Sequence, residues 1–285
     1  GTSRSTFLTG VVPEIQSFLG ASVNTTSHGY FTRGASGYET SNNTITNYRI
    51  DFSNDYAGVI VKGSLTQARK SLAGVGNQSY GYFGGGKSGN STARLTGLSG
   101  YSNVDRLDYS SDSTNMSPKG PLSGARGYVA ATGNASYGYF AGGGSDVNSN
   151  VSTIDRVDYA SDTATASPKG PMTDVLWGIS ASGTPSYGYI YGGLGNQSLP
   201  FGYQPGNPSY GSDYWQTTAT NAKSYVQRID FSNDTATLSP KGNLQRKLYM
   251  TGSTSSQSNA NTTPVTLGPN EVRENFSRVH LMYKI

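Results

Sequence analysis

One set of short segments recurs along the chain in the same order, with a constant distance between its aspartate and its lysine, and this limits the possible folds more than any other feature. A glycine- and tyrosine-rich segment appears as SHGYFTRG (27–34), SYGYFGGG (79–86), SYGYFAGGG (136–144) and SYGYIYGG (186–193). Each copy is followed by an R-x-D segment, in the order YRIDFSND (48–55), DRLDYSSD (105–112), DRVDYASD (155–162) and QRIDFSND (227–234). A lysine stands 11 positions after each of these aspartates, in the pairs Asp51–Lys62, Asp108–Lys119, Asp158–Lys169 and Asp230–Lys241. Four copies with the same spacing indicate one structural unit used repeatedly.

The length of the unit narrows the architecture. The arginines Arg49, Arg106, Arg156 and Arg228 are separated by 57, 50 and 72 residues, and Arg278 lies 50 residues beyond the last. The period is therefore about 50 residues with one insertion, which is typical of a four-stranded propeller blade. Gly, Tyr, Ser, Thr and Asn are frequent and only 13% of residues are charged, a composition that favours strands and turns.

Each unit divides into four strand-like pieces. They are the GYF segment, the R-x-D segment, a Thr/Ala segment that ends in SPKG, and a segment such as ARGYVAATG (125–133). We expect the GYF segment to be the inner strand, because glycines allow close approach at a crowded propeller centre. The sequence therefore predicts an all-β fold, a single propeller domain over residues 1–285 with about five four-stranded blades.

The ends of the chain suggest how the ring closes. TSRSTFLTG (2–10) is comparable with a fourth strand, and ENFSRVHLMYKI (274–285) with a second strand. We expect the N-terminal strand to complete the last blade, which would remove exposed sheet edges. The counterpart of SPKG is missing between Ile285 and Gly1. Either the last blade is one strand short, or the array belongs to a longer chain.

The R-x-D residues are candidates for a repeated structural role. An arginine and an aspartate two positions apart point to the same face of a sheet, where they can pair with each other or cap neighbouring backbone. A calcium role for the aspartates is the alternative, although no loop has the dense spacing of oxygen ligands known for such sites. The eight structural candidates are Arg49, Asp51, Arg106, Asp108, Arg156, Asp158, Arg228 and Asp230.

The order of these motifs carries a family resemblance. GYFAGGG, then DRVDYASDTATASPKGPM, then a variable strand and GYIYGG, resembles kelch repeats, with Ala164 or Thr165 near the place of the kelch tryptophan. The segment QRIDFSNDTATLSPKG (227–242) resembles repeat proteins of tailed bacteriophages that infect marine bacteria and cyanobacteria. The resemblance implies a kelch-like propeller in a virion, that is, an extracellular particle, as part of a tail fibre, a tail or a capsid appendage.

Known catalytic and ligand-binding patterns do not account for the sequence. There are no cysteines and two histidines, and no metalloprotease, nucleophile-elbow or P-loop motif occurs, so we predict no catalytic residues, no metal and no cofactor. The formal charge of +4 comes without Lys/Arg clusters, and no apolar run approaches the length of a membrane span. We therefore expect neither nucleic acid nor membrane as a partner.

The insertion in the fourth unit, residues 194–223, is the one irregular segment. It places aromatic side chains in a Gly/Pro/Asn-rich loop, where they can stack on a sugar, dock a protein, or fold back over the propeller rim. These candidate binding residues are Phe201, Tyr203, Tyr210, Tyr214 and Trp215. The lysines Lys119, Lys169 and Lys241 form either a positive rim for an anionic partner or a device that keeps the sheet ends soluble.

Taken together, the patterns favour a non-enzymatic structural or adhesion protein of a bacteriophage virion. Its expected partners are other virion proteins and a host surface glycan, and we expect an oligomer within the particle. The main alternative is a carbohydrate-active enzyme, a phage depolymerase, which would need a few acids converging in one cleft. An intracellular kelch interaction module is a third possibility.

Overall fold

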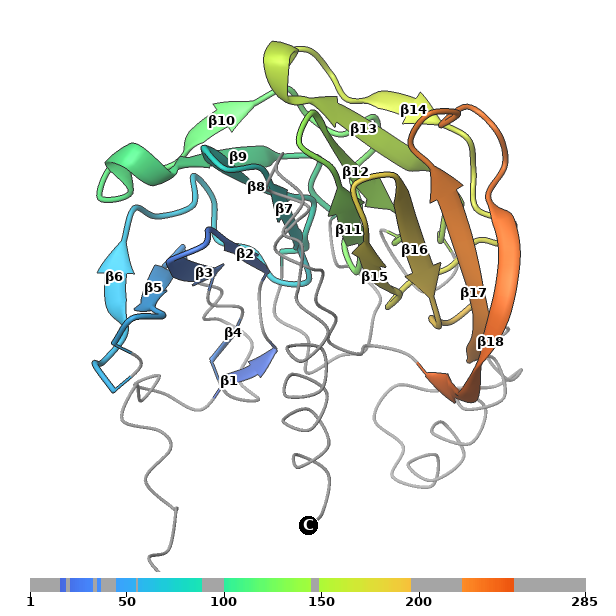
Figure 1. The fold of residues 1–285 in the computed structure, drawn as a ribbon, viewed down its shortest axis with the longest axis horizontal. Coiled ribbons are helices and arrows are strands. Elements are labelled where there is room, and N and C mark those ends of the chain that lie inside the picture. The colour runs from blue at the N-terminus through green and yellow to red at the C-terminus, as the bar shows by residue number, and fades with distance from the viewer. Residues whose placement is uncertain are drawn as a thin grey trace, which may run out of the picture.

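The computed structural model consists of repeated antiparallel β-sheets. It describes residues 16–18, 21–32, 35–36, 45–54, 56–88, 100–144, 149–195 and 222–248. These residues form four four-stranded sheets, here called blades 1 to 4, and a two-stranded sheet of β1 (Gln16–Phe18) and β4 (Ala35–Ser36). Figure 1 shows the four blades following one another in chain order around a common centre, with blades 1 and 4 at the two ends of the arc.

Each blade contains four strands in sequence order across the sheet. Blade 1 comprises β2 (Ser22–Asn24), β3 (His28–Thr32), β5 (Asn47–Asp51) and β6 (Ile60–Lys62). Blade 2 comprises β7 (Ala73–Gly76), β8 (Tyr80–Gly84), β9 (Val104–Asp108) and β10 (Ser117–Lys119). Blade 3 comprises β11 (Ala130–Gly133), β12 (Tyr137–Ala141), β13 (Ile154–Asp158) and β14 (Ser167–Lys169). Blade 4 comprises β15 (Ser180–Gly183), β16 (Tyr187–Tyr191), β17 (Lys223–Asp230) and β18 (Ser239–Leu248).

Local sequence explains why the strands turn where they do. In blade 3 the side-chain oxygen of Asn134 accepts hydrogen bonds from the backbone N–H groups of Ser136 and Tyr137, which closes the turn between β11 and β12. After β13, the Asp158 carboxylate accepts the N–H of Ala160 and opens a short 3₁₀ helix, Tyr159–Ser161. The same two devices recur in blade 2, so the identical motifs produce identical strand registers.

The GYF segment is not the inner strand, and this expectation was wrong. β2, β7, β11 and β15 pack against one another in succession and line the centre, and the GYF strands β3, β8, β12 and β16 lie second. The inner strands carry small side chains such as Ala73, Ala130 and Ser180. The GYF strands carry large aromatic side chains such as Tyr139 and Phe140, both fully buried, which need the wider space between two blades.

Hydrophobic clusters lie between consecutive blades. One cluster joins Val75 and Tyr82 of blade 2 to Val129, Phe140 and Val157 of blade 3, and equivalent clusters join blades 1 and 2 and blades 3 and 4. Each blade thus buries its faces against its neighbours, as repeat architectures require.

The predicted all-β propeller is confirmed, with at least four blades. The described residues form strands and two short 3₁₀ helices and include no α-helix. Among them, no helix is long and apolar enough to cross a bilayer. The predicted closing strand (2–10), the fifth unit (274–285) and most of the insertion fall outside the described residues.

Candidate functional site

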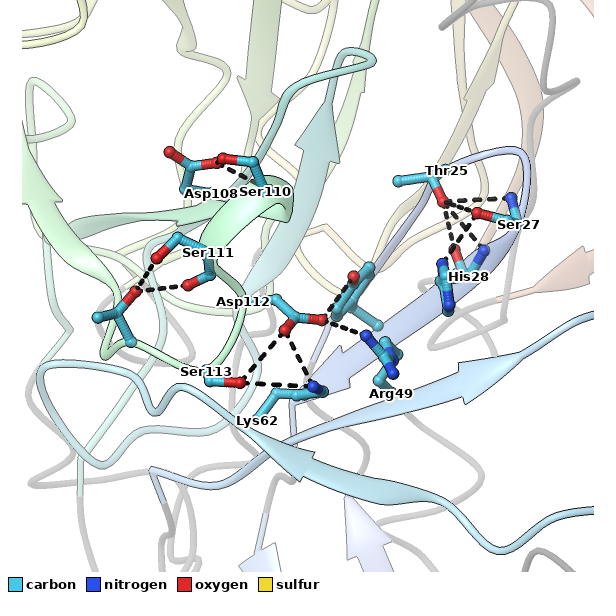
Figure 2. A network of polar contacts seen from close by, with 12 residues as sticks. Thr25, Ser27, His28, Arg49, Lys62, Asp108, Ser110, Ser111, Asp112 and Ser113 are labelled. Carbon is cyan, nitrogen blue, oxygen red and sulfur yellow. Dashed lines mark hydrogen bonds and ion pairs between the residues drawn. The ribbon is translucent and has the colours of Figure 1, made fainter.

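The main polar site of the described residues lies between consecutive blades and is built from residues of all three outer strands. The carboxylate of Asp112, in the turn after β9 of blade 2, receives three donors from blade 1 (Figure 2). The Tyr30 hydroxyl donates to Oδ2 at 2.9 Å, and Arg49 Nη1 donates to the same oxygen at 2.7 Å. Lys62 Nζ lies 3.0 Å from Oδ1. We call this arrangement the inter-blade lock.

The lock recurs at the next two interfaces with the same atoms. Tyr82 and Arg106 donate to Asp162 Oδ2 at 2.9 and 2.7 Å, and Lys119 lies 3.4 Å from Oδ1. In the third copy the carboxylate is Asp234, whose donors are Tyr139 at 2.9 Å, Arg156 at 2.7 Å and Lys169 at 3.8 Å. The donors always come from one blade and the aspartate from the blade that follows it.

Backbone groups complete each lock. The glycine after the lysine, Gly63 in blade 1, donates its N–H to the main-chain oxygen of Asp112 at 2.8 Å. Gly120 and Gly170 make the same bond to Asp162 and Asp234, also at 2.8 Å. The tight approach requires glycine, because a Cβ at Gly120 would collide with the carbonyl of Ala164 in the adjoining turn.

The electrostatics of the first lock favour a permanently ionised carboxylate. Burial opposes ionisation of Asp112, but hydrogen bonds from Lys62, Tyr30 and Arg49 outweigh it and hold the pKa of Asp112 below its ordinary value. Burial and the hydrogen bond to Asp112 raise the pKa of Tyr30 to about 12. A carboxylate coordinated in this way is a structural anion, since its lone pairs are engaged by donors.

The predicted R-x-D pairs separate into two different roles. The three arginines Arg49, Arg106 and Arg156 form ion pairs with an aspartate of the following blade, in place of the aspartate two positions later. Those nearer aspartates cap their own turns by accepting a backbone N–H two residues on, at Asp51, Asp108, Asp158 and Asp230. Arg228 stacks on the ring of Tyr187, with 4.2 Å between its guanidinium carbon and the ring centroid.

The lysines have a role that neither sequence hypothesis contained. Lys119 and Lys169 project into the locks, where they face Asp162 and Asp234. Their side chains are only 13% and 14% exposed, so they are not a free positive rim. Lys241 of blade 4 is exposed.

Sequence reasoning also missed a second, fully buried ion pair. Arg69 pairs with Asp105 at 3.0 Å, and Arg126 pairs with Asp155 at 2.8 Å in the next blade. Blade 4 has neither charge of this pair. Gln227 stands in place of the aspartate, and its side-chain oxygen accepts hydrogen bonds from the backbone N–H and the hydroxyl of Thr173. Comparing the repeats at these positions would have revealed the paired change.

A shallow pocket of about 400 Å³ lies where the turns of blades 2 and 3 meet, lined by Asn77, residues 135–137 and residues 158–160. Its one carboxylate, Asp158, is engaged in the turn cap. Hydrolysis of a glycosidic bond by the usual route requires two carboxyl groups, and the pocket lining supplies one. Across the described ranges, no three His, Cys, Asp or Glu side chains gather into a possible metal site.

The predicted binding residues Phe201, Tyr203, Tyr210, Tyr214 and Trp215 lie outside the described residues. Trp177 is buried against Leu194 and Ala222 and meets the Tyr128 ring edge-on, with the centroids 5.0 Å apart. Its surroundings are those of a packing residue.

Comparison with known proteins supports the fold. Neither a protein-family model nor a curated protein matches the sequence. A solved structure titled "Structure of YjhT" superposes with a TM-score of 0.57 over 82% of this chain and 68% of that chain, at 10% sequence identity. Together with the repeated four-stranded antiparallel sheets, this match identifies a kelch-like β-propeller fold.

Proposed function

We propose that the chain is a non-enzymatic structural or adhesion protein of a bacteriophage virion, in a tail fibre, a tail or a capsid appendage. The observation that carries the proposal is the repeated inter-blade lock. The recurring Asp, Arg, Lys and Tyr side chains, which are the obvious candidates for chemistry, are held by one another between blades. Three successive locks make a stiff scaffold without disulfides, which suits a particle exposed to the medium.

The virion assignment is drawn from the sequence motifs of the repeats, in particular DFSNDTAT-x-SPKG and SYGYFGGG, which resemble those of phage repeat proteins. In this role the insertion of residues 194–223 is the contact surface, with another virion protein or a host glycan as its partner. Loops on rigid scaffolds are where binding residues concentrate, and aromatic side chains supply the contact area.

The test is to image purified virions by cryo-electron microscopy with a gold-labelled antibody against this chain. We expect label at a tail tip, a fibre or a capsid appendage. Protein found in infected-cell extract with no label on particles would refute the virion role. Reproducible degradation of host polysaccharide that is lost when one acid is substituted would establish the depolymerase instead.

A further inference from the structure

The outermost strand of blade 1 exposes apolar side chains. β6 lies at the outer end of its sheet, away from the centre (Figure 1). Ile60 and Val61, the first two residues of this strand, are 50% and 61% exposed, and Tyr56 in the preceding turn is 73% exposed. We call Ile60 and Val61 the blade 1 edge. Such residues at the open edge of a sheet are able to pair with another strand.

The other described blades carry different residues at the equivalent positions. In the same ladder register, each of them has a Ser-Pro pair where blade 1 has Ile60 and Val61. The residue equivalent to Tyr56 is a serine or a threonine. The three pairs are Ser117–Pro118, Ser167–Pro168 and Ser239–Pro240. Because proline on an outermost strand discourages pairing with another edge, blade 1 is the unprotected one among the four.

The exposure of the blade 1 edge follows from its place in the sheet and does not depend on the blade beside it. Blades 2 and 3 each have a described blade on both sides, yet their Ser-Pro pairs, 117–118 and 167–168, are fully exposed as well. The outermost strands therefore stand clear of both neighbouring blades. Since β6 occupies the same place in its own sheet, the blade 1 edge stays exposed when the ring of blades is closed.

The backbone of Val61 offers both a donor and an acceptor on the open side of the sheet. Val61 pairs with Tyr48 as Pro118 pairs with Asp105 in blade 2. Proline has no N–H, so the nitrogen at this register position lies on the side without a neighbouring strand. In an antiparallel ladder the N–H and C=O of one residue point to the same side. Val61 is therefore able to exchange two hydrogen bonds with a residue of another edge.

The charges next to the blade 1 edge are neutralised within the chain. Lys62 Nζ lies 3.0 Å from Asp112 Oδ1, and Arg49 Nη1 lies 2.7 Å from Asp112 Oδ2 (Figure 2). A lysine on an edge strand usually opposes pairing, but the Lys62 side chain is turned into the lock and is only 13% exposed. Residues 56–62 contain no other charged side chain. Two copies of this edge are therefore able to meet without repulsion between like charges.

We propose that the blade 1 edge binds the same edge of a second copy of this chain, with the two β6 strands antiparallel about a two-fold axis. With the axis at Val61, the two Val61 residues exchange two backbone hydrogen bonds. Ile60 of each copy then lies opposite Lys62 of the other and meets the alkyl part of the lysine side chain. A two-fold interface uses the same patch twice, so an edge that is apolar, neutralised and self-complementary in its hydrogen bonds suits a second copy.

The contact is small, and we expect a weak dimer. A strand of three residues on each side buries less surface than stable interfaces do. In an assembly that holds several copies close together, the effective concentration allows a weak contact of this kind to form. The inference does not depend on the virion assignment, because it rests on residues of this chain alone.

Sedimentation velocity of the purified full chain, at concentrations up to about 1 mM, tests the proposal. We expect the sedimentation coefficient of the wild type to rise with concentration towards that of a dimer. The double variant Ile60→Ser, Val61→Pro gives blade 1 the edge of the other blades, and its dissociation constant should be higher by about tenfold or more. Its circular dichroism and thermal midpoint should match those of the wild type, because three blades already fold with this pair.

The reverse exchange shows whether the edge itself causes association. Ser117→Ile with Pro118→Val gives each copy a second open edge, and this variant should form assemblies larger than a dimer. Combined with the blade 1 exchange, it should dimerise again through blade 2. Absence of association in either of these variants would contradict the proposal.

Two further results would overturn the proposal. A wild type that stays monomeric at every concentration would show that a second copy is not the occupant, and would favour a strand from a different protein. Association of the Ile60→Ser, Val61→Pro variant as strong as that of the wild type would place the contact elsewhere on the molecule.

Discussion

A single aspartate at each interface fixes how one blade meets the next. Asp162 gathers a tyrosine, an arginine and a lysine from blade 2, and its own carbonyl accepts a glycine N–H from the same blade. Exposed ion pairs contribute little to stability, but a largely buried carboxylate with several charge-assisted bonds contributes more. Its removal leaves the Arg106 and Lys119 charges uncompensated, and that residual cost dominates the effect.

Asp162→Asn should therefore lower the free energy of unfolding by about 1 to 3 kcal/mol, since an amide keeps the shape and loses the charge. Asp158→Asn, four residues earlier in the same turn, is the matched control and should cost less than about 1 kcal/mol, because asparagine also caps turns. Urea denaturation of both variants provides the measurement. Equal losses in the two variants would contradict a special role for the lock.

The lowered pKa of Asp112 determines how the stability of the fold changes at acidic pH. Its pKa in the folded chain lies below the ordinary value, so the folded state binds fewer protons than the unfolded state as the pH falls. The stabilisation is fully present above a pH of about 4 and is lost as the pH falls through the lowered pKa. Asp112→Asn should be less stable than the wild type at neutral pH and should lose less stability between about pH 5 and pH 2. Urea midpoints measured at intervals of pH check this, and parallel curves for the two proteins would refute it.

At the scale of the element, the outermost strands show how sheet edges are protected. Three of these strands have a proline at their second position, namely Pro118, Pro168 and Pro240. Proline has no backbone N–H to donate, so in an edge strand its nitrogen must lie on the side that has no neighbouring strand. Blade 1 has Val61 at this position, paired with Tyr48 as Pro168 is paired with Asp155. The N–H of Val61 therefore points outward, and Ile60 and Val61 are 50% and 61% exposed.

Val61→Pro should accordingly be tolerated, with a change in unfolding free energy within about 1 kcal/mol in either direction. Ile60→Pro, one position earlier, should destabilise by about 1 to 3 kcal/mol, because its N–H faces β5 and the ladder bond is lost. Thermal and urea unfolding of the two variants decide the point. If Val61→Pro is the more damaging of the two, the register inferred for β6 is wrong.

At the scale of the whole molecule, stability depends on faces that only neighbouring blades can bury. Tyr82 stacks on Tyr159 and bonds Asp162, and the equivalent tyrosines do the same at the other interfaces. Burial raises the pKa of Tyr109 and of Tyr159 above the ordinary value, and the nearby tyrosines add to the effect. These phenols lose their protons far more readily in the unfolded chain than in the propeller.

The propeller should therefore be sensitive to alkali. Stability should change little up to a pH of about 10, the ordinary tyrosine pKa, and should fall above it because the unfolded chain then binds fewer protons. Absorbance at 295 nm should show part of the tyrosines ionising late and together with loss of the β-sheet signal in circular dichroism. Ordinary titration of all tyrosines with the fold intact would contradict the burial seen at these interfaces.

The sequence by itself determined the repeat unit, its four strands and the turns between them, because these depend on short-range patterns. Alternating side chains, Asn and Asp turn caps and glycine endings specify a hairpin wherever they occur, as at Asn134 and Asp158. They predicted the all-β propeller and placed Arg106 and Asp108 on one sheet face. The candidate binding residues of the 194–223 insertion stay a prediction.

Only the tertiary structure decided which strand faces the centre and which aspartate each arginine meets. Strand alternation carries no information on distance from the propeller axis, so the GYF strand was placed one position too far in. The partner of Arg106 is Asp162, 56 residues away, and a sequence-local reading favours Asp108, two residues away. The contact between them exists because adjoining blades stack face to face, and that stacking follows from burying large aromatic side chains between sheets.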